Sequence, residues 1–571
     1  MYKRISFVVL PFFLIVLSCT PQQQPVVDGE WIGFLPNKKS FNFQVTLEHL
    51  DGAKYQLTLV NDTKLIDETF ESSSADHIRF NKDEQLFFNL EKNSEGTALS
   101  GFIKTGKFYY RVRFPKIAKN TFGGPWNPFM VDNGLQSDDI MLYVEHMEDS
   151  TLAAYPFWGD QRFRGMWSGD FEKKGETLFF RDGMTGLNFQ ALFLPDTIEL
   201  KVFLTDVLLT KTNLTHTAEG WDYNRDAVDQ SQNNATPPQT NDGWATANSD
   251  DYGIDTSELA RLVTDIHANT LVNTHSVLIA KEGKLVYENY FEGFNAHIPH
   301  DLRSASKSIS SAIIGIAMDD GILESVDQKL YDFLPESYQA TKDELKSKIR
   351  LKHLLTMSSG LEVNGKASED NYQSTTTTPW LQTVLEAPMV KEPGTYADYG
   401  SANPFLLGVC LNEVLDVPLE DYMDEKLFAP LGITNYINQT DDTYDVPYFG
   451  GGMLLTPRDL LKFGQLYLNK GQWQGRQVIS EQWVEASFQK HLRLQDVQDK
   501  NAYGYLWWHD SYEVKGKEFR SIEARGAGGQ FIFILPELES VVVITAGNFR
   551  NRKGNQSREV LRDYILPALV P

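Results

Sequence analysis

The sequence predicts an α+β protein in which two small all-β modules precede one larger domain of mixed helices and strands. Residues 29–222 alternate apolar and polar side chains with the period of two that half-buried strands show. Residues 223–252 are polar, contain Asn and Pro runs, and predict a linker. Residues 253–571 combine strand-like stretches near both ends with helix-like stretches between them. We therefore expect the last domain to contain an antiparallel sheet in which the two chain ends meet.

The N-terminus has the order of features found in export signals. Two basic residues precede an apolar run that is too short and too poorly flanked to span a membrane, so residues 1–18 predict a signal peptide. The apolar and small residues directly before Cys19 resemble a bacterial lipoprotein signal. This resemblance implies that Cys19 is lipidated, that residues 19–28 form a leash, and that the chain is exported and anchored to a bacterial membrane on its periplasmic or cell-surface side. An ordinary cleaved signal with an incidental cysteine is the alternative.

The composition limits the partners and the chemistry. Acidic residues outnumber basic ones, 77 against 53, and the formal net charge is −24. This charge disfavours nucleic acid and anionic lipid headgroups, so we expect membrane contact through the lipid alone. Cys19 and Cys410 are too few for a disulfide scaffold or a thiolate zinc site, and the 11 histidines are dispersed. We expect no metal and no cofactor, and we expect Cys410 to be an inert core thiol.

The two β modules are expected over residues 29–118 and 119–222. Apolar residues alternate from Phe41 to Leu47, and Asp51-Gly52 and Asp182-Gly183 supply hairpin turns. This pattern predicts that each module is a small sandwich or barrel. The modules are similar in length, but the sequence similarity is too weak to establish a duplication. Their aromatic side chains are more often core than binding residues, although exposed ones would suit a sugar or a peptide.

The residues that could carry chemistry lie in the third region. Ser304 and Lys307 open an amphipathic helix that Gly321 ends, and their i, i+3 spacing places both side chains on one face of its first turn. A buried lysine that loses its proton can act as the base for a serine nucleophile. By itself the pattern is weak, because a capping serine beside a solvated lysine looks the same and Ser487 to Lys490 repeats the spacing.

Further segments strengthen the interpretation, because together with Ser304 to Lys307 they resemble the serine β-lactamase and penicillin-binding-protein family, and its class C-type members, esterases and amidases in particular. The resemblance covers residues 253–571 and implies an antiparallel sheet flanked by helices, with a helical subdomain. The matching segments, in chain order, are 301–316, 350–361, 393–401, 406–408, 451–460, 503–508 and 526–530.

The resemblance implies a role for each matching residue. Ser304 is the acylated nucleophile, and Lys307 and Tyr399 share the acid and base work. Ser401 stands where β-lactamases have the Asn of their Tyr-x-Asn motif, which weakens the case for β-lactam hydrolysis.

The sequence also departs from the third motif of the family. Arg525 and Gly526 replace its cation-Gly pair, and Ala527 offers a backbone N–H to an oxyanion. Pairing of Arg525 with a core acid is an equally weighted alternative. A literal Lys104-Thr105-Gly106 string lies in the first β module and predicts only a hairpin turn.

Three functions follow from these residues. The first is a serine hydrolase that acts on a small-molecule or peptide substrate, an ester or amide that includes peptides and cell-wall fragments, through an acyl-enzyme on Ser304. The second is a β-lactamase or a D-Ala-processing peptidase. The third is an inactive binding or scaffolding lipoprotein whose β modules are the working part.

Overall fold

The computed structural model describes residues 28–35, 41–61, 66–127, 139–158, 168–217, 236–374, 378–495, 502–549 and 551–570. The expected signal peptide and Cys19 lie outside these residues, as does the first half of the expected linker. Within the described residues, no helix is long and apolar enough to cross a membrane.

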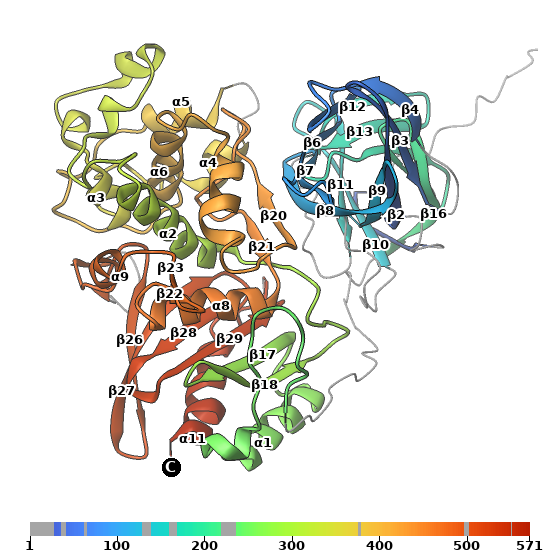
Figure 1. The fold of residues 1–571 in the computed structure, drawn as a ribbon. Coiled ribbons are helices and arrows are strands. Elements are labelled where there is room, and N and C mark those ends of the chain that lie inside the picture. Colours follow the sequence, from blue (N-terminus) through green and yellow to red (C-terminus); the bar gives the residue numbers. More distant parts are fainter. Residues whose placement is uncertain are drawn as a thin grey trace, which may run out of the picture.

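The C-terminal domain is built on an antiparallel sheet of eight strands (Figure 1). The first and last of its long strands, β17 and β29, lie side by side, which confirms that the two ends of the domain meet. In sheet order the strands are β18 (Lys284–Tyr290), β17 (Thr274–Lys281), β29 (Ser540–Ala546), β28 (Gln530–Leu535), β27 (Lys517–Gly526), β26 (Trp508–Val514), β25 (Ala502–Tyr503) and β24 (Leu492–Arg493).

Helices cover both faces of this sheet because its central strands are apolar on both sides. Along β29, Val542 and Ile544 pack with α1, α10 and α11, whereas Val541 and Val543 pack with α2 and α8. A helical subdomain, α3 to α7, lies beside α2 (Figure 1). The helices are α1 (Thr256–His267), α2 (Ser306–Asp319), α3 (Leu351–Leu355), α4 (Glu369–Ser374), α5 (Trp380–Leu385), α6 (Ala402–Asn412), α7 (Leu419–Met423), α8 (Pro457–Leu468), α9 (Glu481–Ser487), α10 (Gln556–Val560) and α11 (Leu566–Leu569).

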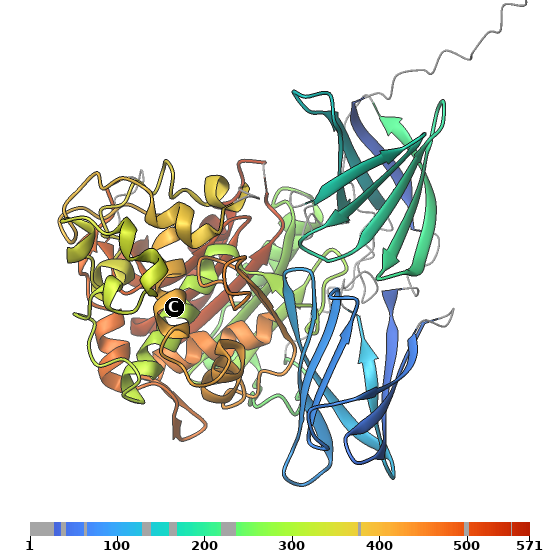
Figure 2. The ribbon, with the colours of Figure 1, turned by 90° about the horizontal axis from the view of Figure 1, so that it is seen from above.

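The N-terminal region consists of strands and forms two modules, each an eight-strand set (Figure 2). We call β2 to β9 the inserted module, because it interrupts the other set between β1 and β10, and we call that other set the host module. The inserted module has the order β4 (Ile66–Glu71), β3 (Lys54–Val60), β2 (Phe43–Asp51), β9 (Thr121–Trp126), β8 (Phe108–Ala118), β7 (Ala98–Thr105), β6 (Leu86–Lys92) and β5 (His77–Lys82). The host module has the order β11 (Leu152–Trp158), β10 (Asp139–His146), β1 (Gly29–Phe34), β16 (Val207–Thr217), β15 (Ile198–Leu204), β14 (Asn188–Phe193), β13 (Thr177–Asp182) and β12 (Ser168–Lys174).

The two strand orders are the same once β1 is matched to β2 and each later strand to its counterpart. This arrangement divides the chain differently from the boundary expected between residues 118 and 119. β1 pairs with β10 and β16 of the host module, and β9 pairs with β2 of the inserted module. The cause is non-local pairing, since alternation marks a strand but not its partner.

The inserted module continues directly into the C-terminal domain. β8 pairs with β20 (Tyr436–Gln439), which pairs with β21 (Met453–Leu455), which pairs with β19 (His300–Asp301). Ile437 and Leu454 on these short strands also pack into the apolar core of the two modules. The sheet of the inserted module therefore ends three residues before Ser304.

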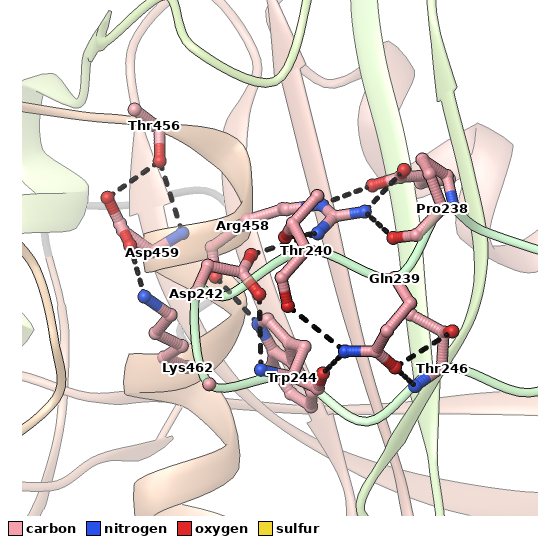
Figure 3. Close-up of polar contacts among 12 residues, drawn as sticks. Pro238, Gln239, Thr240, Asp242, Trp244, Thr246, Thr456, Arg458, Asp459 and Lys462 are labelled. Atoms are coloured by element: carbon pink, nitrogen blue, oxygen red, sulfur yellow. Dashed lines mark hydrogen bonds and ion pairs between the residues drawn. The ribbon is translucent and has the colours of Figure 1, made fainter.

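The described part of the expected linker, residues 236–252, packs against the C-terminal domain instead of lying in solvent. Trp244 is only 2% exposed, and its indole N–H donates to the carbonyl of Arg458 on α8. The buried Arg458 guanidinium bonds to Glu288 and also to Asp242 and Thr240 of this segment (Figure 3). The polar composition that suggests a solvated linker thus supplies partners for one buried charge.

Candidate active site

The turn that carries Ser304 is held from both sides. Ser304 lies in a short 3-10 turn, Arg303–Ala305, that leads into α2. Arg303 has a φ of 48°, which a non-glycine residue adopts only when its surroundings hold it there. The Asp301 carboxylate provides that support, because it accepts the Arg303 backbone N–H at 2.9 Å and forms an ion pair with its side chain. β27 packs closely on the same turn, since a Cβ at Gly526 would overlap the Leu302 carbonyl.

Lys307 lies directly beneath Ser304. Its side chain is 1% exposed, and Nζ donates to Ser304 Oγ at 2.8 Å, to Ser401 Oγ at 3.1 Å and to the Gly450 carbonyl. Burial lowers the pKa of Lys307 to about 8, while the Glu369 carboxylate acts in the opposite direction. The Tyr399 ring centroid is 5.5 Å from Nζ. The structure therefore brings Ser304, Lys307, Tyr399 and Ser401 together.

Glu369 is a site residue that sequence reasoning missed. Its two carboxylate oxygens accept the Ser401 hydroxyl and the Tyr448 hydroxyl, each at 2.9 Å, and Tyr448 also bonds to Tyr372. A hydrogen-bonded chain thus runs from Ser304 through Lys307 and Ser401 to Glu369. The only signal in the sequence is an acidic pair in a polar stretch, and no motif spacing connects it to Tyr399.

Arg525 fits both interpretations left open by the sequence. Its guanidinium forms ion pairs with Glu523 at 2.6 Å and Asp510 at 2.7 Å, as the alternative of a core acid expects. It also lies 4.8 Å from the Trp508 ring centroid and lines a cavity together with Ser304. The charge of Arg525 is therefore balanced by two carboxylates, and its side chain still lines the cavity beside Ser304.

Two cavities meet at Ser304, and both are lined by Ser304 and Ala527. The acidic cavity has a volume of about 270 Å³ and is lined by Met184, Arg303, Ser304, Glu369, Asp370, Gln373, Gln439, Gly450, Gly451 and Ala527. The basic cavity has a volume of about 640 Å³ and is lined by Ser304, Tyr399, Trp508, Arg525, Gly526, Ala527, Phe531, Arg552, Gly554, Asn555 and Arg558.

The other residues singled out in the sequence lie elsewhere. Lys104-Thr105-Gly106 is at the turn between β7 and β8, as expected. Ser487 ends α9, where its hydroxyl is buried and donates to the Trp483 carbonyl. Cys410 is a buried thiol whose pKa burial raises, which agrees with an inert core residue. Two of the dispersed histidines, half-buried His353 and buried His509, also lie outside the cluster around Ser304, and burial lowers the pKa of each to about 4.

The fold and this site define an α+β domain with a serine and a buried lysine on one helical turn. A family model described as Beta-lactamase matches residues 259–569. The chain belongs to the beta-lactamase family, which includes esterases, amidases and acyltransferases as well as penicillin-binding-protein-like members.

Two curated relatives show how far the similarity extends. The 6-aminohexanoate-dimer hydrolase of Paenarthrobacter ureafaciens is 23% identical over 295 residues, which are 47% of this chain and 71% of that protein. The monacolin J acid methylbutanoyltransferase of Aspergillus terreus is 30% identical over 155 residues, which are 24% of this chain and 37% of that protein.

Solved structures that resemble this chain cover a little over half of it. EstCE1, described as a hydrolase with promiscuous acyltransferase activity, is 16% identical with a TM-score of 0.44, covering 53% of this chain and 98% of its own. A family VIII carboxylesterase is 15% identical with a TM-score of 0.42, covering 55% of this chain and 96% of its own.

Proposed function

We propose that the chain is a serine hydrolase that cleaves an ester or amide through an acyl-enzyme on Ser304. The observation that carries the proposal is the 2.8 Å hydrogen bond between a fully buried Lys307 ammonium and Ser304 Oγ. With a pKa of about 8, a useful fraction of Lys307 is neutral near physiological pH and can accept the Ser304 proton.

The steps follow from the positions of these groups. Neutral Lys307 takes the proton of Ser304, Oγ bonds to the substrate carbonyl carbon, and the bond to the leaving atom breaks as Tyr399 delivers a proton to that atom and takes the proton held by Lys307 in its place. Water then adds to the acyl carbon and gives one proton to Lys307, and the bond between the acyl carbon and Oγ breaks as this proton returns to Ser304, which releases the carboxylic acid. We assign stabilisation of the oxyanion to the backbone N–H groups of Ser304 and Ala527, because both residues line both cavities.

The charges around the site favour a substrate with an amino group on its acyl part and a carboxylate on its leaving group. Tyr399 lines the basic cavity, so the leaving group belongs there, beside Arg552 and Arg558. The acyl part then occupies the acidic cavity, where Glu369 and Asp370 attract a cation. A short peptide-like amide has this distribution of charge. The relative named 6-aminohexanoate-dimer hydrolase supports hydrolysis as the reaction.

The decisive test is covalent labelling by a fluorophosphonate. The wild type is expected to be labelled, and Ser304→Ala is expected to remove the label completely. An unlabelled wild type would favour the inactive binding lipoprotein instead. Turnover of a p-nitrophenyl ester, a chromogenic cephalosporin and a D-Ala peptide then separates an esterase or amidase from a β-lactamase or peptidase. We expect the cephalosporin to be the poorest substrate, because Ser401 replaces the motif Asn.

We also propose export and lipid attachment at Cys19, on the signal described above. Growth of an expressing bacterium with an alkyne-labelled fatty acid should label the wild type, and Cys19→Ala should abolish the label. A labelled Cys19→Ala variant would contradict the assignment.

A further inference from the structure

The acidic cavity is not built by the C-terminal domain alone. Met184, which lines this cavity with Ser304 and Glu369, belongs to the host module, where it lies in the turn between β13 and β14. Its side chain is 8% exposed. A residue more than 100 positions before the nucleophile thus forms part of the wall beside it.

The turn that carries Met184 is rigid. The buried Asp182 carboxylate accepts the Thr185 hydroxyl at 2.5 Å and the Thr185 backbone N–H at 3.0 Å. The Gly186 N–H donates to the Asp182 carbonyl at 2.8 Å, and the Asp182 N–H donates to the Leu187 carbonyl at 2.9 Å. These bonds close the turn on itself, so Met184 keeps one position relative to the host module.

A second turn, Thr105 to Lys107 of the inserted module, holds the first one in place. The Lys107 N–H donates to the Met184 carbonyl at 2.9 Å, and the Thr105 hydroxyl donates to the Thr185 carbonyl at 3.0 Å. The two turns touch backbone to backbone, because a Cβ at Gly106 would overlap the backbone of Met184 and Gly186. The Lys104-Thr105-Gly106 string therefore positions Met184.

The same hairpin is attached to the catalytic site. The Thr440 N–H donates to the Lys107 carbonyl at 2.7 Å, and Lys107 Nζ donates to the Asp441 carbonyl at 3.1 Å. Gln439, next to Thr440 on β20, lines the acidic cavity. Backbone hydrogen bonds therefore connect Met184 through β8 and β20 to the turn that carries Ser304.

We propose that Met184 is the end wall of the subsite for the acyl group and sets the longest acyl chain that the enzyme accepts. This inference rests on the proposed hydrolase function, in which the leaving group lies on the Tyr399 side and the acyl group in the acidic cavity. At about 270 Å³ the cavity lies just below the range of roughly 300–1,000 Å³ that is usual for small-molecule sites. It therefore admits a short acyl chain, which meets the flexible thioether of Met184 at its end.

The test measures kcat/KM for p-nitrophenyl acetate, butyrate, hexanoate and octanoate. The wild type is expected to prefer the short esters, and Met184→Ala is expected to raise kcat/KM for the longer ones by about tenfold while acetate changes little. Met184→Phe should act in the opposite direction and lower kcat/KM for butyrate relative to kcat/KM for acetate. Met147→Ala is the matched control, because Met147 is an exposed methionine at another turn of the host module.

The outcomes separate this inference from the function on which it rests. If the wild type is labelled at Ser304 but Met184→Ala and Met184→Phe leave the chain-length profile unchanged, or lower all esters equally, the inference is wrong and the hydrolase stands. If the wild type is neither labelled nor active, both are wrong. Gly106→Ala, which keeps Met184 but displaces its turn, should also admit longer esters, and an unchanged profile in that variant would contradict the positioning role.

Discussion

The two cavities that meet at Ser304 differ in size, in charge and in origin. The basic cavity is larger, contains three arginines, and is lined entirely by residues of the C-terminal domain. The acidic cavity is less than half its volume, contains two carboxylates and one arginine, Arg303, and is completed by Met184 of the host module. The host module thus contributes a residue to the wall of the acidic cavity, whereas the basic cavity is independent of it.

The difference also divides the chemistry. Tyr399 lines the basic cavity, whereas Glu369 lines the acidic one and reaches Lys307 through Ser401. The group that we propose as the acid and the carboxylate that is coupled to the proposed base thus lie on opposite sides of one serine. Substitutions on each side should therefore give different kinetic signatures.

The largest effect is expected at Lys307, because its hydrogen bond to Ser304 lies where the two cavities meet. Lys307→Met removes the base and should lower the acylation rate by about 10³-fold or more, as measured by stopped-flow release of p-nitrophenol. Lys346→Met is the matched control, because Lys346 is a buried lysine that donates to the Leu385 carbonyl and pairs with Asp343, and it is not among the residues that line either cavity. Acylation by Lys307→Met at the wild-type rate would contradict the assignment of the base.

Tyr399→Phe tests the basic side. Loss of the acid should lower amide turnover by about 10²-fold, but p-nitrophenyl ester turnover much less, because p-nitrophenolate leaves without a proton. Tyr396→Phe, three residues earlier, should leave both substrates unchanged. Equal losses on ester and amide would show that Tyr399 does not protonate the leaving atom.

Glu369→Gln tests the acidic side through pH. Lys307 acts as a base only when neutral, so acylation should rise with pH through a pKa of about 8. The Glu369 carboxylate favours the ammonium form, so its removal should lower the pKa of Lys307 further and move this rise to lower pH. Asp370→Asn, in the same cavity, is the control: its rise in acylation with pH should lie nearer that of the wild type than the rise of Glu369→Gln does. A rise that stays in place in Glu369→Gln would exclude the coupling.

The smallest effect is expected at the rim of the basic cavity. Arg552 is exposed, so Arg552→Gln should lower kcat/KM by no more than about fivefold, and only for leaving groups that carry a carboxylate. The measurement compares a peptide acid with its amide. A loss of equal size on both substrates would place the carboxylate site elsewhere.

The sequence was sufficient where function depends on neighbours in the chain. Ser304 and Lys307 share one helical turn, and Tyr399 and Ser401 share one short segment, so local spacing was enough to predict them as candidates, and the structure places the four side chains together. Glu369 and Met184 reach the site only through tertiary packing, and no spacing marks them. Their positions depend on the docking of α4 and of the host module, which a pattern of apolar residues does not encode.

The same limit explains the module boundaries and the linker. Alternation correctly indicated strands in the described part of residues 29–222, but β1 pairs across the whole inserted module. Trp244 and Asp242 lie in a polar stretch of the sequence that is typical of a solvated linker. The stretch packs against the C-terminal domain because it bonds to Arg458, which lies more than 200 residues later on α8.

The interrupted topology of the host module sets an order for the maturation of the protein. Ile32 of β1 pairs with Met141 of β10 and with Thr215 of β16, so a chain that folds as it is synthesised leaves its first strand without a partner until the whole inserted module has emerged. The eight strands of the inserted module pair with one another before β8 gains β20 of the C-terminal domain, so this module is able to fold earlier. The turn with Met184 closes in the later of the two modules, and the C-terminal domain emerges last. The selectivity for the acyl group that we propose is therefore acquired at the end of folding, when all three parts of the chain have docked.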